Sequence, residues 1–194
     1  MEDDKVKWID NITHEDEIEF KTIPEWIVVK NHNGYKYAER KGVDSVAFVL
    51  FDINTEDLNR IGLIKEIKPS INRMMVSAFG GSLDQEHYKD DLRVLVKEEV
   101  MEEAGFNVEL QDIKFYGKVL VSSQMNQFCY LFGVTVDKKL QTQRTTTNPA
   151  ELLSEIMWFQ LSEISELEDW KAITIVSKKI IGSNSRLVIR PITS

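Results

Sequence analysis

The chain has 194 residues, of which 42% are hydrophobic and 29% are charged, so it is long enough for one packed domain with an extension. Its net charge of -8 excludes DNA as an expected partner and disfavours RNA, because binding to either needs clustered Lys and Arg. A local basic patch would make RNA binding plausible again. The single cysteine, Cys129, cannot form an internal disulfide, so we expect a core residue in a cytoplasmic protein. No run is apolar enough for a signal peptide or a membrane span, so we expect no membrane association.

Five runs of β-forming residues follow an acidic, weakly periodic start over residues 1–20. Turn-forming residues separate these runs, which is the pattern of successive strands. The predicted strands lie at 25–30, 35–40, 44–52, 60–67 and 73–79. We therefore predict that the first half of the domain is mostly sheet.

The periodicity becomes helical in the segment that follows. Leu92, Leu95 and Val96 recur at helical spacing, and Gly105 is a suitable left-handed cap, so we predict a helix that ends there. Two strands, a polar loop, a short strand and a last helix are predicted next, at 113–123, 128–137, 138–151, 156–161 and 169–180. This order predicts an α+β sandwich with a mixed sheet.

Four glutamates occupy the six positions from Glu98 to Glu103, at the end of the predicted helix. At 100° per residue, Glu99, Glu102 and Glu103 share the face of the preceding apolar residues. Two unit charges about 4 Å apart repel by roughly 4 kcal/mol at an effective dielectric near 20. A divalent cation removes this penalty, and oxygen ligands favour Mg²⁺ or Mn²⁺. The alternative is a solvent-exposed acidic stripe.

The stretch from Gly81 to Phe106 resembles the Nudix box, whose pattern is GX5EX7REUXEEXGU, with U a bulky apolar residue. The positions in register at its end are Glu99, Val100, Glu102, Glu103, Gly105 and Phe106. The resemblance implies a Nudix-type α/β/α sandwich in which the box glutamates hold divalent ions that bridge a substrate pyrophosphate. It also implies that an activated water attacks one phosphorus.

The sequence departs from the Nudix pattern upstream of these glutamates. The family arginine falls on Glu98, which either adds a metal ligand or faces solvent, and we favour solvent. Arg93 and Lys97 point elsewhere on the helical wheel. The gap after the glycines is three residues longer than in the family, so the upstream acid is Asp90 when counted from the helix and lies beside Glu86 when counted from the glycines.

Over roughly residues 40–180 the layout resembles the ADP-ribose pyrophosphatase branch of the superfamily. We divide the chain into an N-terminal extension with one or two strands, a Nudix hydrolase domain and a tail, at 1–40, 41–183 and 184–194. The resemblance implies cleavage of the pyrophosphate bond of a nucleoside diphosphate linked to another moiety, with ADP-ribose or a nucleotide sugar as first substrates. Many relatives dimerise, so a homodimer is also open.

The resemblance assigns roles to residues inside and outside the box. Its metal ligands are Glu99, Glu103, Glu102 and Gly81, and its catalytic carboxylates are Glu102, Glu99, Glu155 and Glu151. Its substrate-binding residues are Lys68, Arg73 and Gly81. Glu151 and Glu155 are alternative general bases, or ordinary loop acids. Lys68 and Arg73 either bind phosphates or keep a strand edge soluble.

Two other functions remain open. The first is a Nudix-fold protein that binds nucleotides with little turnover, which Glu98 in place of the arginine favours. The second is a nucleoside triphosphate or RNA-cap pyrophosphohydrolase, for which the net charge makes RNA the less attractive substrate.

Overall fold

The computed structural model describes residues 5–7, 17–21, 27–40, 44–53, 60–83 and 86–183. The predicted tail at 184–194 lies outside these residues, as do parts of the predicted extension.

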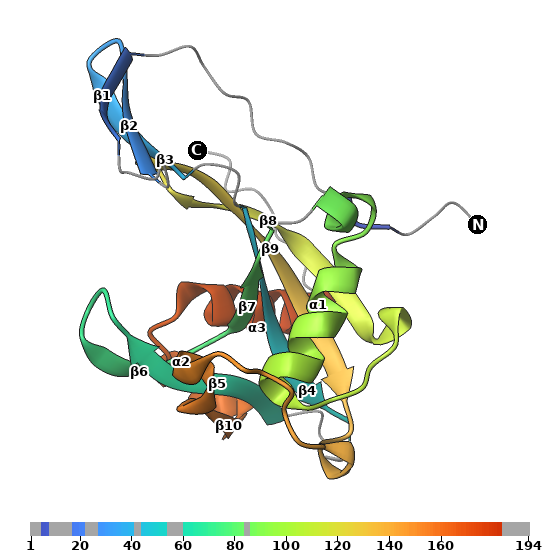
Figure 1. The fold of residues 1–194 in the computed structure, drawn as a ribbon. Coiled ribbons are helices and arrows are strands. Elements are labelled where there is room, and N and C mark those ends of the chain that lie inside the picture. The colour runs from blue at the N-terminus through green and yellow to red at the C-terminus, as the bar shows by residue number, and fades with distance from the viewer. Residues whose placement is uncertain are drawn as a thin grey trace, which may run out of the picture.

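The described strands form one mixed sheet that runs through the molecule (Figure 1). They are β1 (Glu17–Lys21), β2 (Ile27–His32), β3 (Tyr35–Arg40), β4 (Ser45–Asp52), β5 (Arg60–Lys68), β6 (Arg73–Ser77), β7 (Phe79–Ser82), β8 (Ile113–Ser122), β9 (Met125–Val136) and β10 (Glu155–Gln160). The strand order is β1-β2-β3-β9-β4-β5-β10, with β6 on β5, β7 on β4 and β8 on β9. β9 runs parallel to β3 and β4, and the other described pairs are antiparallel.

Strand β4 is the centre of the sheet. It pairs with β9 along its whole length, and its other edge is shared by β7 and β5. Its side chains alternate between two cores, with Phe48 in one and Val49 in the other. A strand covered on both faces is a near-continuous apolar run, which explains the sequence of residues 45–51.

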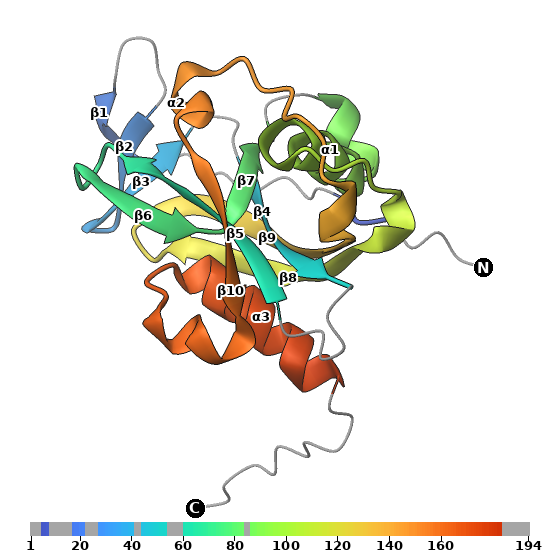
Figure 2. The same ribbon diagram turned by 90° about the horizontal axis from the view of Figure 1, so that it is seen from below.

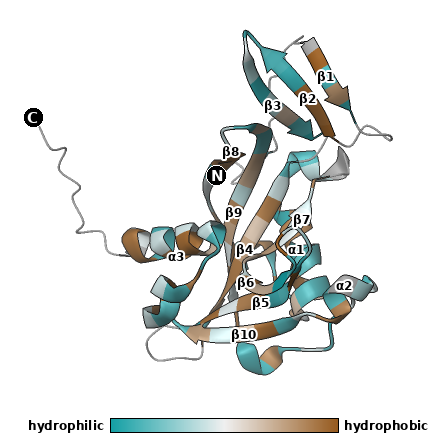
Figure 3. Cartoon of the chain, turned by 90° about the vertical axis from the view of Figure 1, so that its left-hand side faces the viewer, coloured by the Kyte–Doolittle hydropathy of each residue, from teal (hydrophilic) through white to brown (hydrophobic). Residues whose placement is uncertain are grey.

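Helices cover the two faces of the sheet. The helix α1 (Arg93–Glu99) and its continuation η2 (Val100–Ala104) pack over the first core, and α3 (Trp170–Ser183) packs over the second. Figure 2 shows α1 and α3 on opposite sides of the strands. Figure 3 shows apolar residues along β4 and β9 between these helices. The predicted α+β sandwich with a mixed sheet is therefore confirmed.

The remaining helices are short and connect the layers. They are η1 (Glu86–Asp90), η3 (Leu110–Asp112), η4 (Lys138–Leu140), α2 (Pro149–Leu152) and η5 (Leu161–Glu166). The predicted strand at 73–79 divides into β6 and β7 at Ala78, which pair with different strands. In the described part of the chain, no helix is both long and apolar enough to cross a membrane.

The strands β1, β2 and β3 project from the body of the molecule (Figures 1 and 3). They form an antiparallel ribbon, and β3 joins the main sheet where Ala38 pairs with Met125 of β9. The predicted extension at 1–40 thus carries three described strands, where the sequence predicted one or two. Its apolar side chains Ile18 and Phe20 are 56% and 59% exposed.

Candidate functional site

The glutamate-rich helix changes its hydrogen bonding at the point where the glutamates begin. Gly105 caps it with φ 71° and ψ 31°, as predicted, and its N–H donates to the carbonyls of both Met101 and Val100. The bond to Val100 closes a wider, π-helical turn, in which each residue rotates by less than 100°. Glu103 is only 7% exposed, whereas its neighbour Glu102, about 100° away around the helix axis, is exposed. The helical-wheel prediction that Glu102 faces inward was therefore wrong.

The two glycines of strand β7, Gly80 and Gly81, lie directly against the helix. The N–H of Gly80 donates to Oε2 of Glu103 at 3.4 Å. A Cβ atom on Gly81 would stand 2.1 Å from Oε1 of Glu99, and one on Gly80 would stand 2.6 Å from the carbonyl oxygen of Val46. Both glycines therefore lack a side chain because β4, β7 and the helix approach too closely to accommodate one.

Glu103 carries the most unusual electrostatics of this site. Burial, and then the charges of Glu99, Glu151 and Glu66, raise the pKa of Glu103 to about 8, although the Gly80 hydrogen bond lowers it. A carboxylate in this environment is costly near neutral pH unless a proton or a cation accompanies it. The site is therefore suited to bind positive charge.

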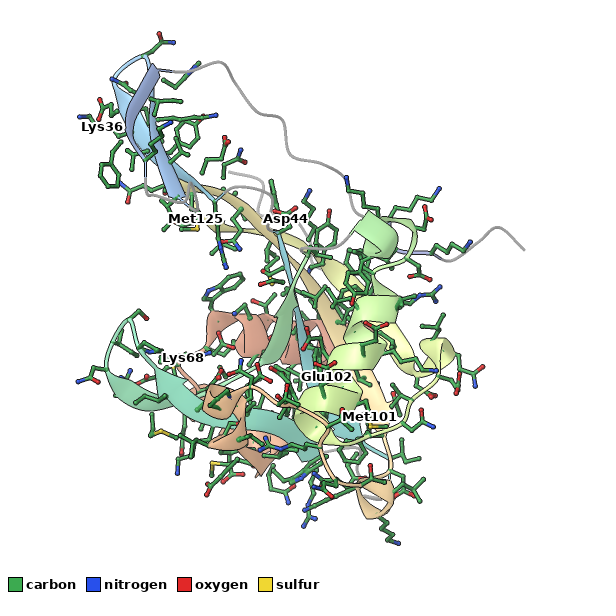
Figure 4. All side chains as sticks on the ribbon, in the orientation of Figure 1. Lys36, Asp44, Lys68, Met101, Glu102 and Met125 are labelled. Atoms are coloured by element: carbon green, nitrogen blue, oxygen red, sulfur yellow. The ribbon has the colours of Figure 1, made fainter. Side chains whose placement is uncertain are left out.

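A cavity of about 440 Å³ opens beside Glu103, and four of the sequence-predicted site residues line it: Lys68, Gly81, Glu103 and Glu151. Lys68 donates a hydrogen bond to Glu66, a second cavity carboxylate. Figure 4 shows Lys68 among the side chains on the side of β5 and β6, away from Glu102 at the lower end of the helix. Glu99 adjoins the cavity through its contact with Gly81.

The polar loop after β9 holds Glu151 in the cavity wall. The carboxylate of Glu151 accepts hydrogen bonds from the hydroxyl of Thr146 and from Nδ2 of Asn148, the latter at 2.6 Å. The guanidinium of Arg144 donates to the carbonyls of Glu151 and Ser154, each at 3.1 Å. These bonds fix one of the two candidate general bases at the site.

Three of the predicted site residues lie elsewhere in the structure. Glu155, on β10, is 4.0 Å from Lys65 and its side chain is 71% exposed. Arg73 forms an exposed ion pair with Glu168. Glu102 is exposed on the helix, where its carbonyl accepts a hydrogen bond from the N–H of Thr146 at 3.2 Å.

The position of the family arginine carries no cation here. Glu98 is exposed, as we favoured, and its carboxylate accepts a hydrogen bond from the hydroxyl of Tyr88 at 2.5 Å. Lys97 pairs with Glu109 at 3.2 Å and Arg93 pairs with Asp91 at 2.7 Å. These two cations therefore point away from the buried glutamates, as the helical wheel predicted. Of the candidate upstream acids, Asp90 is exposed and the side chain of Glu86 lies outside the described part.

The cavity also contains residues that the sequence did not single out. They include Arg40, Glu66, Gln127, Trp170 and Lys171. Asp169 positions Trp170 and Lys171 at the cavity. Its buried carboxylate accepts hydrogen bonds from the N–H groups of Ala78 at 2.7 Å and Ala172 at 3.4 Å. The only local signal was an acidic residue at the start of the last predicted helix, which is a usual helix cap.

The donors at the site fit a hard divalent cation. No group of three or more His, Cys, Asp and Glu side chains within the described ranges stands ready to hold a metal ion. Mg²⁺, however, is commonly bound through one or two carboxylates and completes its shell with waters and substrate phosphates. Glu99 and Glu103 lie against Gly81 and Gly80 of β7, and their charges interact. Two neighbouring carboxylates of this kind match such a site.

No family model matches the sequence, and no curated protein matches it. Among solved structures, a crystal structure described as an ADP compounds hydrolase is similar, with a TM-score of 0.62 and 15% sequence identity. The similarity covers 94% of this chain and 100% of that chain. At this identity the likeness concerns the fold, and this chain therefore has a Nudix-like fold similar to that of a hydrolase of ADP compounds.

Proposed function

We propose that this chain is a divalent-metal-dependent hydrolase that cleaves the pyrophosphate bond of a nucleoside diphosphate linked to another moiety, such as ADP-ribose or a nucleotide sugar. The observation that carries the proposal is the buried carboxylate of Glu103 in a cavity that also contains Arg40, Lys68 and Lys171. These cations would bind an anionic substrate, and the glutamates need a separate positive charge, such as a metal ion, to offset their own. The similar fold of an ADP compounds hydrolase supports the choice of substrate class.

Glu99 and Glu103 would hold Mg²⁺ or Mn²⁺, with the backbone of Gly81 and the exposed Glu102 as further candidate ligands. When bound, the ion supplies charge that screens the pyrophosphate and lowers the pKa of a coordinated water. The N–H of Gly80, on β7, donates to the Glu103 carboxylate and holds it in position.

Cationic and aromatic residues of the cavity would bind the substrate. Lys68, Lys171 and Arg40 bind phosphate oxygens, and Trp170 offers an aromatic face to a base. Lys68 must exchange its bond with Glu66 for one to the substrate. Of the two candidate substrate contacts on strands, Lys68 and Arg73, Arg73 is the less favoured, because it pairs with Glu168.

Glu151 is the better placed of the two candidate general bases. It lines the cavity, and Thr146 and Asn148 hold its carboxylate. In this role it orients the attacking water and accepts its proton. Glu155 would act only if β10 presented it to the cavity, and its place beside Lys65 makes it the second choice.

Hydrolysis of ADP-ribose and nucleotide sugars with Mg²⁺ or Mn²⁺, followed by chromatography of the products, tests this proposal. Glu103→Gln should lower kcat by at least about a hundredfold, because it removes the charge of a metal ligand. The amide oxygen still accepts the Gly80 N–H, so the variant should fold. Glu166→Gln, an exposed carboxylate on η5, is the matched control and should leave turnover unchanged. Equal activity of the wild-type protein and Glu103→Gln would refute the assignment.

A second candidate function is nucleotide binding with little turnover. It is favoured by Glu98, which stands where the family has its arginine and is bonded to Tyr88. Tight binding of ADP-ribose with no product in the presence of either ion would favour this function over hydrolysis. A triphosphate or RNA-cap substrate would instead appear in the same assay as preferential cleavage of those compounds.

For the molecule as a whole, we propose a cytoplasmic protein that forms a homodimer and has a nucleotide as its small-molecule substrate. We propose neither DNA nor a membrane as a partner.

A further inference from the structure

A second cavity, of about 1010 Å³, lies apart from the glutamate site and shares no described lining residue with it. Four segments that are separate in the sequence contribute to it: residues 5–7, the first residue of α1, residues 110–118, and Tyr130 of β9. Its lining residues that matter here are Lys5, Lys7, Arg93, Lys114, Phe115 and Lys118. Within the described chain, five lining residues are cationic and none is acidic, although the protein carries a net charge of -8.

An irregularity in β8 places one of these cations on the aromatic face of the sheet. Phe115 pairs with Phe132, and Lys118 pairs with Tyr130, because the register shifts by one residue between Phe115 and Gly117. Phe132 and Tyr130 are two residues apart and share a face, so Phe115 and Lys118 share it too. Without the extra residue, Lys118 would point to the other face of the sheet.

The bulge is held in place from the opposite face. Gly117 has φ +133°, a conformation that L side chains rarely adopt. Nζ of Lys178, on α3, donates to the carbonyl of Tyr116 at 2.7 Å. These backbone and side-chain features fix the bulge, and the bulge in turn fixes the face of the sheet on which Lys118 lies.

Aromatic rings form one wall of the cavity. Phe115 is 37% exposed and packs on the rings of Tyr130 and Phe132, with centroids 6.2 Å and 5.3 Å away. Nζ of Lys118 lies 3.9 Å from the ring centroid of Phe128 and 5.2 Å from that of Tyr130. An exposed ring and an ammonium group therefore share this face of the sheet, an arrangement that suits a planar group with an attached anion.

The N-terminal segment adds further positive charge to the rim. The N–H of Leu92 donates to the carbonyl of Val6 at 2.8 Å, which fixes the segment that contains Lys5 and Lys7 at the start of α1. Asp91 neutralises Arg93 through hydrogen bonds of 2.7 to 3.2 Å. Lys114 pairs with Gly133 and so points to the opposite face of the sheet, which leaves Lys5, Lys7 and Lys118 to give the cavity its positive charge.

We infer that this cavity is a second binding site, for a small aromatic compound that carries a phosphate group. The lysines would bind the phosphate, and the ring of Phe115 would contact the aromatic body. A single-stranded nucleic acid needs a succession of exposed rings on which bases stack. Phe115 is exposed here, but Tyr130 is only 2% exposed, so the observations favour a small molecule.

Calorimetric titration with 1-naphthyl phosphate, in the presence of EDTA, tests this inference. The wild-type protein should bind the compound with a dissociation constant below about a millimolar, and added salt should weaken the binding. Lys118→Glu and Lys7→Glu should each raise the dissociation constant at least tenfold. Lys139→Glu, which reverses an exposed charge outside the cavity on η4, should leave it unchanged.

Each variant is checked for folding by thermal unfolding and for hydrolysis of ADP-ribose. Neither Lys118 nor Lys7 lines the glutamate cavity, so hydrolysis should persist where it occurs in the wild-type protein. Equal affinity in Lys118→Glu, Lys7→Glu and the wild-type protein would overturn the inference. So would equally tight binding of 1-naphthol or of inorganic phosphate, and so would complete competition by oligouridylate.

Discussion

Glu103 is the residue whose charge the fold disfavours most. Its pKa is raised from 4.5 to about 8 by burial and by the neighbouring carboxylates of Glu99, Glu151 and Glu66. Between these two pH values the folded state binds more protons at Glu103 than the unfolded state does. The free energy of unfolding must therefore fall as pH rises through this window, and level off above it.

We accordingly expect the metal-free protein to be less stable at pH 8.5 than at pH 6. The loss due to Glu103 should be about 3 kcal/mol, since about two units separate pH 6 from the folded-state pKa of about 8 and each unit corresponds to about 1.36 kcal/mol. Urea unfolding in EDTA at the two pH values measures it. Glu103→Gln removes the titrating group and should flatten this dependence, and Mg²⁺ should reduce it in the wild-type protein. The same slope in both proteins would show that Glu103 is not the cause.

Glu98 offers a different test, because it occupies the place of the family arginine. Its side chain is exposed and bonded to Tyr88, so it is not among the residues that line the cavity. Glu98→Arg should leave kcat/KM unchanged or raise it, since a cation would then stand near the glutamates. A loss of a hundredfold or more would mean that Glu98 is itself a metal ligand.

At the scale of single residues, the sequence predicted Glu99 and Glu103 through their spacing, and Lys68 and Gly81 through the resemblance. It could not choose between Glu151 and Glu155, because both precede the same strand. The choice depends on bonds from Thr146 and Asn148, which form only when the loop is folded.

The glycines of β7 and the glutamate-rich helix pack so closely that a change in one displaces the other. Gly81→Ala would place a Cβ 2.1 Å from Oε1 of Glu99, so the carboxylate must move. Because this carboxylate is the end of a flexible side chain, we expect a loss of activity of at least tenfold with a change in unfolding free energy below about 1 kcal/mol. Steady-state kinetics and urea unfolding measure the two effects.

Gly182→Ala provides the matched control. A Cβ at this position of α3 meets nothing within 4 Å. The substitution should leave activity unchanged and stabilise the helix by up to about 1 kcal/mol, since Ala has the higher helix propensity. If both variants lost activity alike, close packing against Glu99 would not be the reason.

At the scale of elements, hydrophobic periodicity predicted most of the strands and both long helices. It could not predict the π-helical turn, because one shifted hydrogen bond changes no residue in the pattern. Glu102 and Glu103 are about 100° apart on a regular helix, and the periodicity did not show that only Glu103 is buried. It also could not predict that residues 17–21 form a strand, since their pairing with β2 decides it.

For the whole molecule, we expect a homodimer that uses the projecting ribbon of β1, β2 and β3. Its exposed Ile18 and Phe20 lie on β1, at the edge of the sheet. Light scattering of the wild-type protein should give twice the mass of one chain. The double variant Ile18→Asp, Phe20→Asp should give the mass of a single chain. Leu153→Asp, which alters a residue that is 79% exposed elsewhere, should leave the mass unchanged. A wild-type monomer at tens of micromolar would refute the expectation.

The cavity walls show why the complete site could not be read from the sequence. Arg40, Gln127 and Trp170 reach the same cavity from three distant segments. Their neighbourhood depends on the parallel pairing of β9 with β3 and β4, which no local pattern specifies.

The hydrogen bond from Ala78 to Asp169 has a consequence for the order of assembly during translation. The ribosome synthesises the glutamates long before it synthesises Asp169, Trp170 and Lys171. A nascent chain that stops short of residue 169 can already contain Glu99, Glu102 and Glu103. It still lacks one side of the cavity and the carboxylate of Asp169, which binds the N–H of Ala78 next to β7. The site therefore matures only when the closing helix has left the exit tunnel.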